Sequence, residues 1–175
     1  GASGIINYTC EDNLFEKYLN HNKRGLKQFP ENFILPIQYV LFGNCAIKTQ
    51  LLKEVSGFNK DLIGYGGEEI ELLHRINEIK NLKILKIEAL AVRVNHPKLV
   101  RHCSRLFEFG QTNFKHLPYS MQKTIIPSFF LKSHMILPIS MIYSILFFIY
   151  QSFHINSFLL IKYLLGLSIL KGYKN

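Results

Sequence analysis

The C-terminal part of the chain lacks acidic residues altogether. Residues 109–175 carry six lysines and no Asp or Glu, whereas residues 1–108 carry 15 Lys or Arg and 12 Asp or Glu. A basic tail favours a nucleic acid or an anionic membrane surface as partner. The residues around these lysines are apolar, and Tyr and Phe are concentrated in apolar runs without Arg. We therefore expect a membrane partner and no nucleic acid.

Charge of either sign is missing from one long run. Residues 133–161, 29 positions, contain no Asp, Glu, Lys or Arg. This is more than the roughly 20 apolar residues that cross a bilayer core. Its two apolar segments, residues 135–150 and 157–170, have lysines on their outer flanks. The positive-inside tendency therefore predicts that both flanks are cytoplasmic.

The manner of membrane attachment stays open at this point. The second apolar segment is short and contains Lys162. Two full spans, a shallow hairpin and two interfacial helices all agree with this pattern, and an apolar pair of helices in a soluble protein is a further alternative. We expect residues 118–175 to form hydrophobic membrane-associated helices. They would hold the protein, anchored or peripheral, at the cytoplasmic face of a membrane through residues 125–172.

Cysteine is scarce, and the N-terminus lacks a targeting signal. The three cysteines, Cys10, Cys45 and Cys103, form no Cys-x-x-Cys pair. This excludes the usual zinc and redox motifs, and an odd count disfavours a disulfide framework. We expect reduced, mostly buried thiols. The first residues have no basic stretch followed by an apolar one, so we do not expect them to be a signal peptide.

The first two-thirds of the chain mixes strand and helix patterns. Apolar residues make up 48% of the 175 positions, enough for the core of one domain of ordinary size. Hydrophobic periodicity and turn residues predict the elements. Strands are expected at residues 4–8 and at residues 37–47, where the strand enters a turn at Gly43-Asn44. Residues 82–94 indicate either a pair of strands or one bent strand, and helices are expected at residues 11–24, 49–55, 68–80 and 98–117. This mixture predicts an α/β or α+β layered fold.

Two glycines followed by two glutamates precede the predicted helix at residues 68–80. Without Cβ atoms, Gly66 and Gly67 allow a positive φ or the close approach of a ligand. Glu68 and Glu69 would then lie at the helix N-terminus, where the helix dipole favours ionised carboxylates by about 0.3–1 kcal/mol. A carboxylate held in this way is suited to act as a general base. The alternative is an ordinary loop followed by a helix cap.

His96 ends an apolar strand pattern and precedes a proline. Ligands of α/β folds bind at the carboxyl ends of strands, so this histidine is a candidate ligand-binding residue. The alternative is a histidine in a surface loop.

These patterns together resemble the second half of a family 2 glycosyltransferase catalytic domain, which has the GT-A fold. The resemblance is good over residues 35–96 and loose over residues 4–34 and 97–117. We therefore expect an α/β fold, with residues 1–117 as the C-terminal half of a GT-A domain. The matching positions are Asn44, Ile47-Lys48, Ser56-Gly57-Phe58-Asn59-Lys60, Gly64-Tyr65-Gly66-Gly67-Glu68-Glu69 and Arg75.

The resemblance implies transfer of a sugar from a nucleotide-sugar donor to the hydroxyl of a glycan or lipid-linked acceptor. Glu69 would take the proton of the acceptor hydroxyl, and Glu68 would bind or orient the acceptor. Gly66, Gly67 and Asn44 would line the acceptor site. His96 would be a ligand of a divalent metal, Mn²⁺ or Mg²⁺, which neutralises the diphosphate leaving group.

The sequence departs from the family pattern in two ways. The family usually has Asp where Glu69 stands, and a misplacement of about an ångström can cost about 100-fold in rate. The family also has an Asp-x-Asp metal motif in its donor-binding half, and none occurs in the 175 residues. We therefore expect the chain to be the C-terminal part of a longer enzyme, with little transfer activity of its own. The alternatives are a non-catalytic, membrane-anchored interaction module on a glycosyltransferase scaffold, and a small membrane protein whose α/β part only packs.

Overall fold

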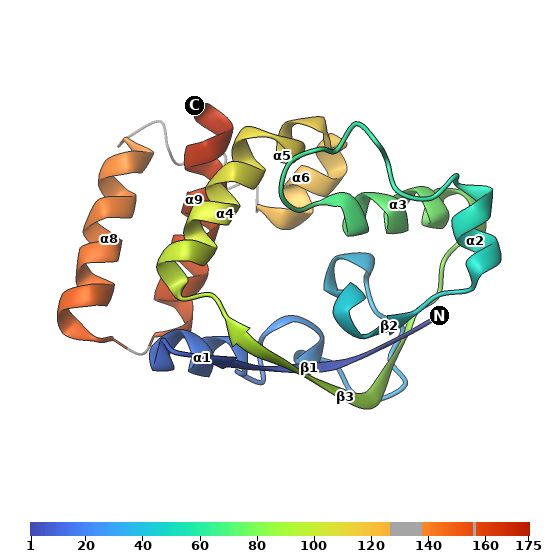
Figure 1. Ribbon diagram of the computed structural model, residues 1–175, viewed down its shortest axis with the longest axis horizontal. Coiled ribbons are helices and arrows are strands. Elements are labelled where there is room, and N and C mark those ends of the chain that lie inside the picture. The colour runs from blue at the N-terminus through green and yellow to red at the C-terminus, as the bar shows by residue number, and fades with distance from the viewer. Residues whose placement is uncertain (127–137, 156) are drawn as a thin grey trace.

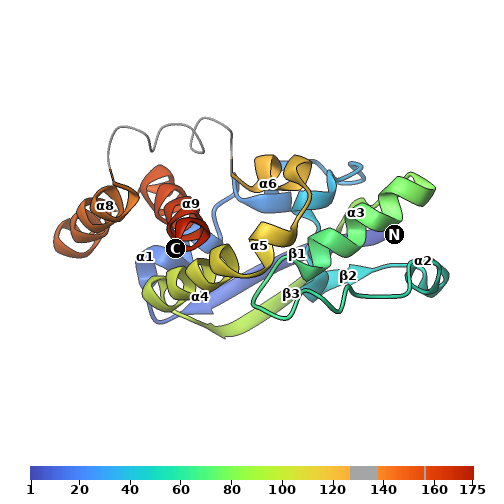
Figure 2. The ribbon, with the colours of Figure 1, turned by 90° about the horizontal axis from the view of Figure 1, so that it is seen from above.

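The computed structural model describes residues 1–126, 138–155 and 157–175 (Figure 1). It is an α/β structure with a small mixed sheet of three strands at one side and helices packed over it (Figures 1 and 2). In chain order its elements are β1 (Ala2–Cys10), α1 (Asn13–Leu19), η1 (Gly25–Gln28), η2 (Ile37–Tyr39), η3 (Phe42–Asn44), β2 (Cys45–Ala46), α2 (Thr49–Glu54), α3 (Glu68–Lys80), β3 (Leu85–His96), α4 (Leu99–Gln111), α5 (Asn113–His116), α6 (Tyr119–Ile125), α8 (Ile139–Phe153) and α9 (Phe158–Lys174).

β1 is the central strand of the sheet, whose order is β2-β1-β3. It pairs in parallel with β3 along most of its length, with irregularities between Ser3 and Ile5 and between Tyr8 and Cys10. Ile6, Tyr8 and Cys10 are buried on one face, as the period-2 alternation of a strand requires. The predicted strand at residues 4–8 is therefore confirmed and longer than expected. The apolar pattern at residues 82–94 forms one strand, β3, and not a pair.

The strand predicted over residues 37–47 is wrong in most of its length. The chain forms the two 3-10 turns η2 and η3, and only Cys45–Ala46 pair with β1. The hydroxyl of Ser3 accepts a hydrogen bond from the backbone N–H of Leu41 at 3.2 Å and donates one to the backbone oxygen of Asn44 at 3.3 Å. These bonds hold the turns against β1 in place of a regular ladder.

Asp12 joins the start of α1 to two distant helices. Its Oδ1 accepts the backbone N–H of Phe15 at 3.1 Å as the N-cap of α1. Its Oδ2 lies 3.4 Å from the backbone nitrogen of Leu99, at the start of α4. The hydroxyl of Tyr150 in α8 donates to the same carboxylate, at 2.8 Å from Oδ1. One carboxylate thus ties α1, α4 and α8 together.

α4 and α9 pack along each other at very short distance (Figures 1 and 2). A Cβ on Gly110 would meet the backbone oxygen of Ile169, and a Cβ on Gly172 would meet that of Phe107. The helix expected over residues 98–117 is interrupted at Thr112, where α4 ends and α5 begins. α9 therefore rests on α4 by backbone-to-backbone contact.

The charge-free run lies partly outside the described residues, which omit 127–137 and 156. In the part of the chain that is described, no helix has both the length and the apolar character needed to cross a bilayer. α8 exposes Met141, Ile145 and Phe148, which follow one another at the i, i+4, i+7 spacing of a single helix face. α8 carries no charged residue.

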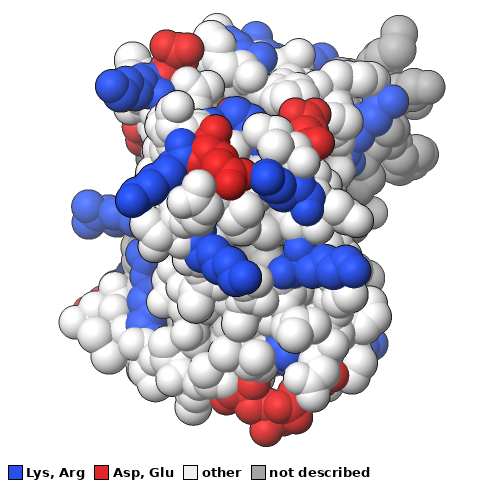
Figure 3. All heavy atoms as spheres, turned by 90° about the vertical axis from the view of Figure 1, so that its right-hand side faces the viewer, with Lys and Arg blue, Asp and Glu red and all other residues white. Residues whose placement is uncertain are grey.

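The face over α2 and α3 carries charges of both signs (Figure 3). Lys and Arg side chains lie between groups of Asp and Glu. The ion pair between Lys80 and Glu54, at 3.3 Å, joins the end of α3 to the end of α2. All three cysteines are free, as expected, and Cys10 and Cys103 are buried.

Candidate active site

The two glycines before α3 adopt the backbone conformation that favours glycine. Gly66 has φ of 78° and Gly67 has φ of 90°, and Gly67 is the N-cap of α3. The atoms nearest to their missing side chains belong to Phe109 of α4: a Cβ on Gly67 would lie 2.7 Å from the ring. In this structure the two glycines therefore allow the left-handed turn and leave room for the ring of Phe109.

Asn113 fixes the loop that carries these glycines. Its side chain is buried, accepts the backbone N–H of Gly64 at 3.1 Å and donates to the carbonyl oxygens of Gly64 and Gly66, both at 2.8 Å. Thr112 lies where a Cβ on Gly64 would be. Sequence reasoning missed Asn113, because it lies almost 50 positions after the loop and belongs to no local motif.

Arg75 holds the first part of the same motif, near Gly57, in place. Its guanidinium pairs with Glu71 at 2.7 Å and donates to the carbonyl oxygens of Val55 at 2.6 Å and Gly57 at 2.8 Å. The turn after α2 is thereby fixed to α3. The arginine that the resemblance places on this helix has a positioning role here.

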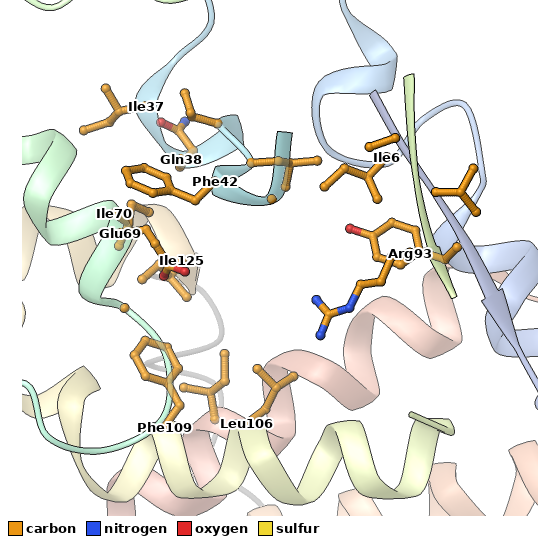
Figure 4. A pocket seen from close by; sticks show the side chains of 18 residues that line it. Ile6, Ile37, Gln38, Phe42, Glu69, Ile70, Arg93, Leu106, Phe109 and Ile125 are labelled. Atoms are coloured by element: carbon orange, nitrogen blue, oxygen red, sulfur yellow. The ribbon is translucent and has the colours of Figure 1, made fainter. Parts of the chain in front are cut away.

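Glu69 lines a cavity of about 690 Å³ between α3, α4, β3 and the turns η2 and η3 (Figure 4). Gly67 borders the same cavity. The other lining residues are mostly apolar or aromatic: Ile6, Tyr8, Ile37, Gln38, Val40, Leu41, Phe42, Gly43, Ile70, Ala91, Val92, Arg93, Leu106, Phe109, Ile125 and Ile169. Such an apolar cavity with few polar groups is typical of small-molecule sites.

The environment of Glu69 makes its carboxylate more basic. Burial raises the pKa of the Glu69 carboxyl above its ordinary value, and the neighbouring Glu68 carboxylate adds to the rise. A hydrogen bond from the backbone N–H of Glu69 opposes both effects. A base works best when its pKa approaches the working pH, so this shift suits proton abstraction.

Glu68, the neighbouring acid, is placed differently. It is not among the residues that line the cavity, and its Oε2 is buried without a hydrogen-bond partner among the described residues. The structure therefore brings Gly67 and Glu69 together at the cavity but not Glu68. An acceptor-binding role for Glu68 stays a prediction.

The side chain of Asn44 forms hydrogen bonds within the sheet. Its amide nitrogen donates to the carbonyl oxygens of Ile5 in β1 and Ala89 in β3, both at 2.9 Å. Its neighbour Gly43 lines the cavity, but Asn44 does not. The side chain thus bridges two strands, and its predicted contact with an acceptor has no support from this placement.

His96 lies at the end of β3, as expected, but borders a different hollow. It is 7% exposed and packs against the rings of Tyr8, Phe15 and His102. Neither ring nitrogen has a hydrogen-bond partner among the described residues. Burial, followed by the charge of Arg93, lowers the pKa of His96 to about 4.

A neutral imidazole with free nitrogens could serve as one metal ligand. The hollow that His96 borders is also lined by Glu11, Asn95, Pro97, Lys98, Val100, Arg101, Ser104 and Arg105. Within residues 1–126, 138–155 and 157–175, no group of three or more His, Cys, Asp or Glu could hold a metal ion. These residues alone do not complete a metal site.

Part of the chain, including most of the predicted site residues, matches a known family model. Residues 24–103 match the family model described as the N-terminal domain of galactosyltransferase. The match covers less than half of the chain and supports a glycosyltransferase domain, without distinguishing family 2 or the GT-A fold. It includes Asn44, Gly66–Glu69 and His96, but neither Phe109 nor Asn113. No significant match was found among curated proteins or solved structures.

Proposed function

We propose that this chain provides the acceptor side of a sugar-transfer site in which Glu69 is the general base. The observation that carries the proposal is the position of Glu69, half-buried at the start of α3 and on the wall of a largely apolar cavity. The match to a galactosyltransferase family model supports sugar transfer in general. A nucleotide-sugar would be the donor, and a glycan or a lipid-linked sugar would be the acceptor.

A carboxylate oxygen of Glu69 takes the proton of the acceptor hydroxyl while the hydroxyl oxygen forms a bond to the anomeric carbon of the donor sugar. The bond from that carbon to the diphosphate breaks, and the diphosphate leaves with the electron pair. Asn113 and Arg75 would keep the Gly66–Gly67 turn and α3 in place during this step. The expected Mn²⁺ or Mg²⁺ stays a prediction, with His96 as its candidate ligand.

The test is the exchange of Glu69 for Gln in the complete gene product, assayed with a set of nucleotide-sugars. Loss of general-base catalysis should lower the transfer rate by about 10²- to 10⁴-fold. Glu88→Gln is the matched control, because Glu88 is exposed on β3 and lies outside the cavity. Equal rates in wild type and Glu69→Gln would contradict the proposal.

The same experiment addresses the main alternative, a non-catalytic interaction module on a glycosyltransferase scaffold. Glu in place of the usual Asp and the packing of Phe109 against both glycines favour this alternative. A module of this kind would keep its binding activity in Glu69→Gln and show no sugar transfer in any variant.

We also propose that α8 holds the protein at a membrane surface. Its exposed apolar side chains Met141, Ile145 and Phe148 and its lack of charge support this, as do the lysines near the end of α9. Phe148→Glu should reduce co-flotation of the protein with anionic vesicles. Ile79→Glu, on the exposed side of α3, should not. Flotation that is equal in both variants would rule out α8 as the contact.

A further inference from the structure

One cationic side chain, that of Arg93, is present among the described residues that line the cavity beside Glu69. Arg93 extends into it from β3, on the wall opposite Glu69 (Figure 4). Glu69 and Arg93 are the only charged side chains among the 18 residues that line it. Apolar side chains, among them Phe42, Phe109 and Leu106, border the space between the two (Figure 4). A ligand that fills this cavity would therefore meet an acid at one end and a guanidinium at the other.

Arg93 has no partner of its own in the described part of the chain. No ion pair or hydrogen bond of its guanidinium is present there, although its neighbourhood holds further cations. Arg24 stacks over the ring of Tyr8 at 5.3 Å, and Arg105 over the ring of Tyr65 at 5.5 Å. Both arginines are therefore in contact with aromatic rings and not with acids.

Arg93 is the register partner of Tyr8 in the sheet, and Arg24 lies over the ring of Tyr8. Neither arginine forms an ion pair within the described residues, so a bound anion would neutralise positive charge here. A guanidinium binds phosphate through two parallel hydrogen bonds, which gives direction as well as strength.

We propose that Arg93 binds a phosphate group of a substrate whose hydroxyl-bearing or sugar end lies toward Glu69. This inference rests on the proposed function for the choice of phosphate, because nucleotide-sugars and lipid-linked acceptors both carry it. The phosphate belongs either to the nucleotide diphosphate or to a polyprenyl phosphate. In both cases the guanidinium of Arg93 supplies positive charge beside the phosphate.

The first test is calorimetric titration of the 175-residue chain with inorganic pyrophosphate at low salt. Arg93→Gln should weaken binding at least about 10-fold, the equivalent of 1.4 kcal/mol. Arg93→Lys should keep part of the affinity, because the charge remains and the two-pronged geometry is lost. Arg93 is exposed, so these variants should melt like wild type.

Arg101→Gln is the matched control, because this arginine is exposed on α4 and lines the second hollow. It should leave pyrophosphate affinity within about twofold, a modest effect expected of a charge outside the contact. No binding by wild type, or equal losses in the Arg93 and Arg101 variants, would overturn the proposal.

Two further arms identify the source of the phosphate. Binding of UDP or GDP that depends on Arg93 indicates the donor. Binding of phosphatidylcholine vesicles containing a polyprenyl phosphate, with the same dependence, indicates a lipid-linked acceptor. If neither depends on Arg93, the proposal fails.

These readouts do not require turnover, so the two proposals can fail separately. Arg93-dependent binding without any Glu69-dependent transfer would refute the proposed function alone. If transfer depends on Glu69 but pyrophosphate affinity is the same in wild type and the Arg93 variants, only the present inference is refuted.

Discussion

The hydroxyl of Tyr150 lies 2.8 Å from Oδ1 and 3.0 Å from Oδ2 of Asp12, 138 positions earlier in the chain. The contact joins α8 to the N-cap of α1, and Tyr150 is 6% exposed. Burial and the Asp12 carboxylate raise the pKa of Tyr150, so the phenol stays protonated and donates. The apolar C-terminal helices are thereby connected to the sheet end of the molecule by a charge-assisted hydrogen bond.

Tyr150→Phe should lower the free energy of unfolding by about 1.5–3 kcal/mol, the usual contribution of a hydrogen bond to a charged group. Urea denaturation measures this change. Tyr173→Phe serves as control, since Tyr173 makes a ring contact with Phe114 and is 37% exposed. It should change stability by less than about 0.5 kcal/mol. Equal effects would mean that the contact with Asp12 contributes nothing.

Gly172→Ala should destabilise the protein by roughly 1–3 kcal/mol, because its methyl group would meet the backbone oxygen of Phe107 and force α4 and α9 apart. Gly166→Ala, in the same helix, has no atom within 4 Å of the added Cβ. It should leave stability unchanged or raise it by up to about 1 kcal/mol. Thermal unfolding of the two variants tests the contact, and a shift of the same sign in both would contradict it.

Asn113→Ala should release the Gly64–Gly66 loop, because the loop loses three hydrogen bonds with a buried amide. The loss of stability should reach at least about 2 kcal/mol, since backbone groups are left without partners. Hydrogen exchange at the amide of Gly64 should become faster. Asn22→Ala, at an exposed position, is the control. Unchanged exchange in Asn113→Ala would show that the loop is held in another way.

Acid should destabilise the protein through His102. Burial, then His96 and the arginines Arg24, Arg105 and Arg93, lower the pKa of His102 from 6.5 to about 3. Below pH 6.5 the unfolded chain binds a proton that the folded chain does not. The free energy of unfolding should therefore fall by about 1.4 kcal/mol per pH unit from about pH 6.5 toward pH 3 and be unaffected by this group above it.

Denaturation of His102→Phe between pH 7 and pH 4 tests this. The variant should lose that part of the pH dependence, whereas His116→Gln, which removes an exposed histidine, should keep it. A wild-type slope in His102→Phe would mean that other groups cause the acid sensitivity.

Local signals in the sequence determined several elements. The helix predicted at residues 68–80 is α3 to the residue, because Gly67 can take the left-handed N-cap conformation and three glutamates follow in the first turn. The helix at residues 49–55 and the strand at residues 4–8 likewise follow from short-range periodicity. The position of Glu69 at a helix start was therefore readable from the chain alone.

Tertiary structure decided what local patterns could not. The apolar run at residues 37–47 has the composition of a strand, yet hydrogen bonds from Ser3 and Asn44 hold it as turns. Leu90, Val92 and Val94 look like core residues but are 61%, 57% and 66% exposed. The alternation of a strand predicts which residues share a face, but only the packing of other elements decides whether that face is covered.

The candidate site was likewise determined partly by the sequence and partly by the tertiary structure. The sequence motif predicted Gly67 and Glu69. Phe109, Asn113 and Arg93 reach the same loop and cavity from α4, α5 and β3, which only the folded chain brings together. Periodicity reports which residues share a face of one element, and it carries no information about which elements meet. Burial and the pairing of backbone groups over long distances decide that, and they exist only in the folded chain.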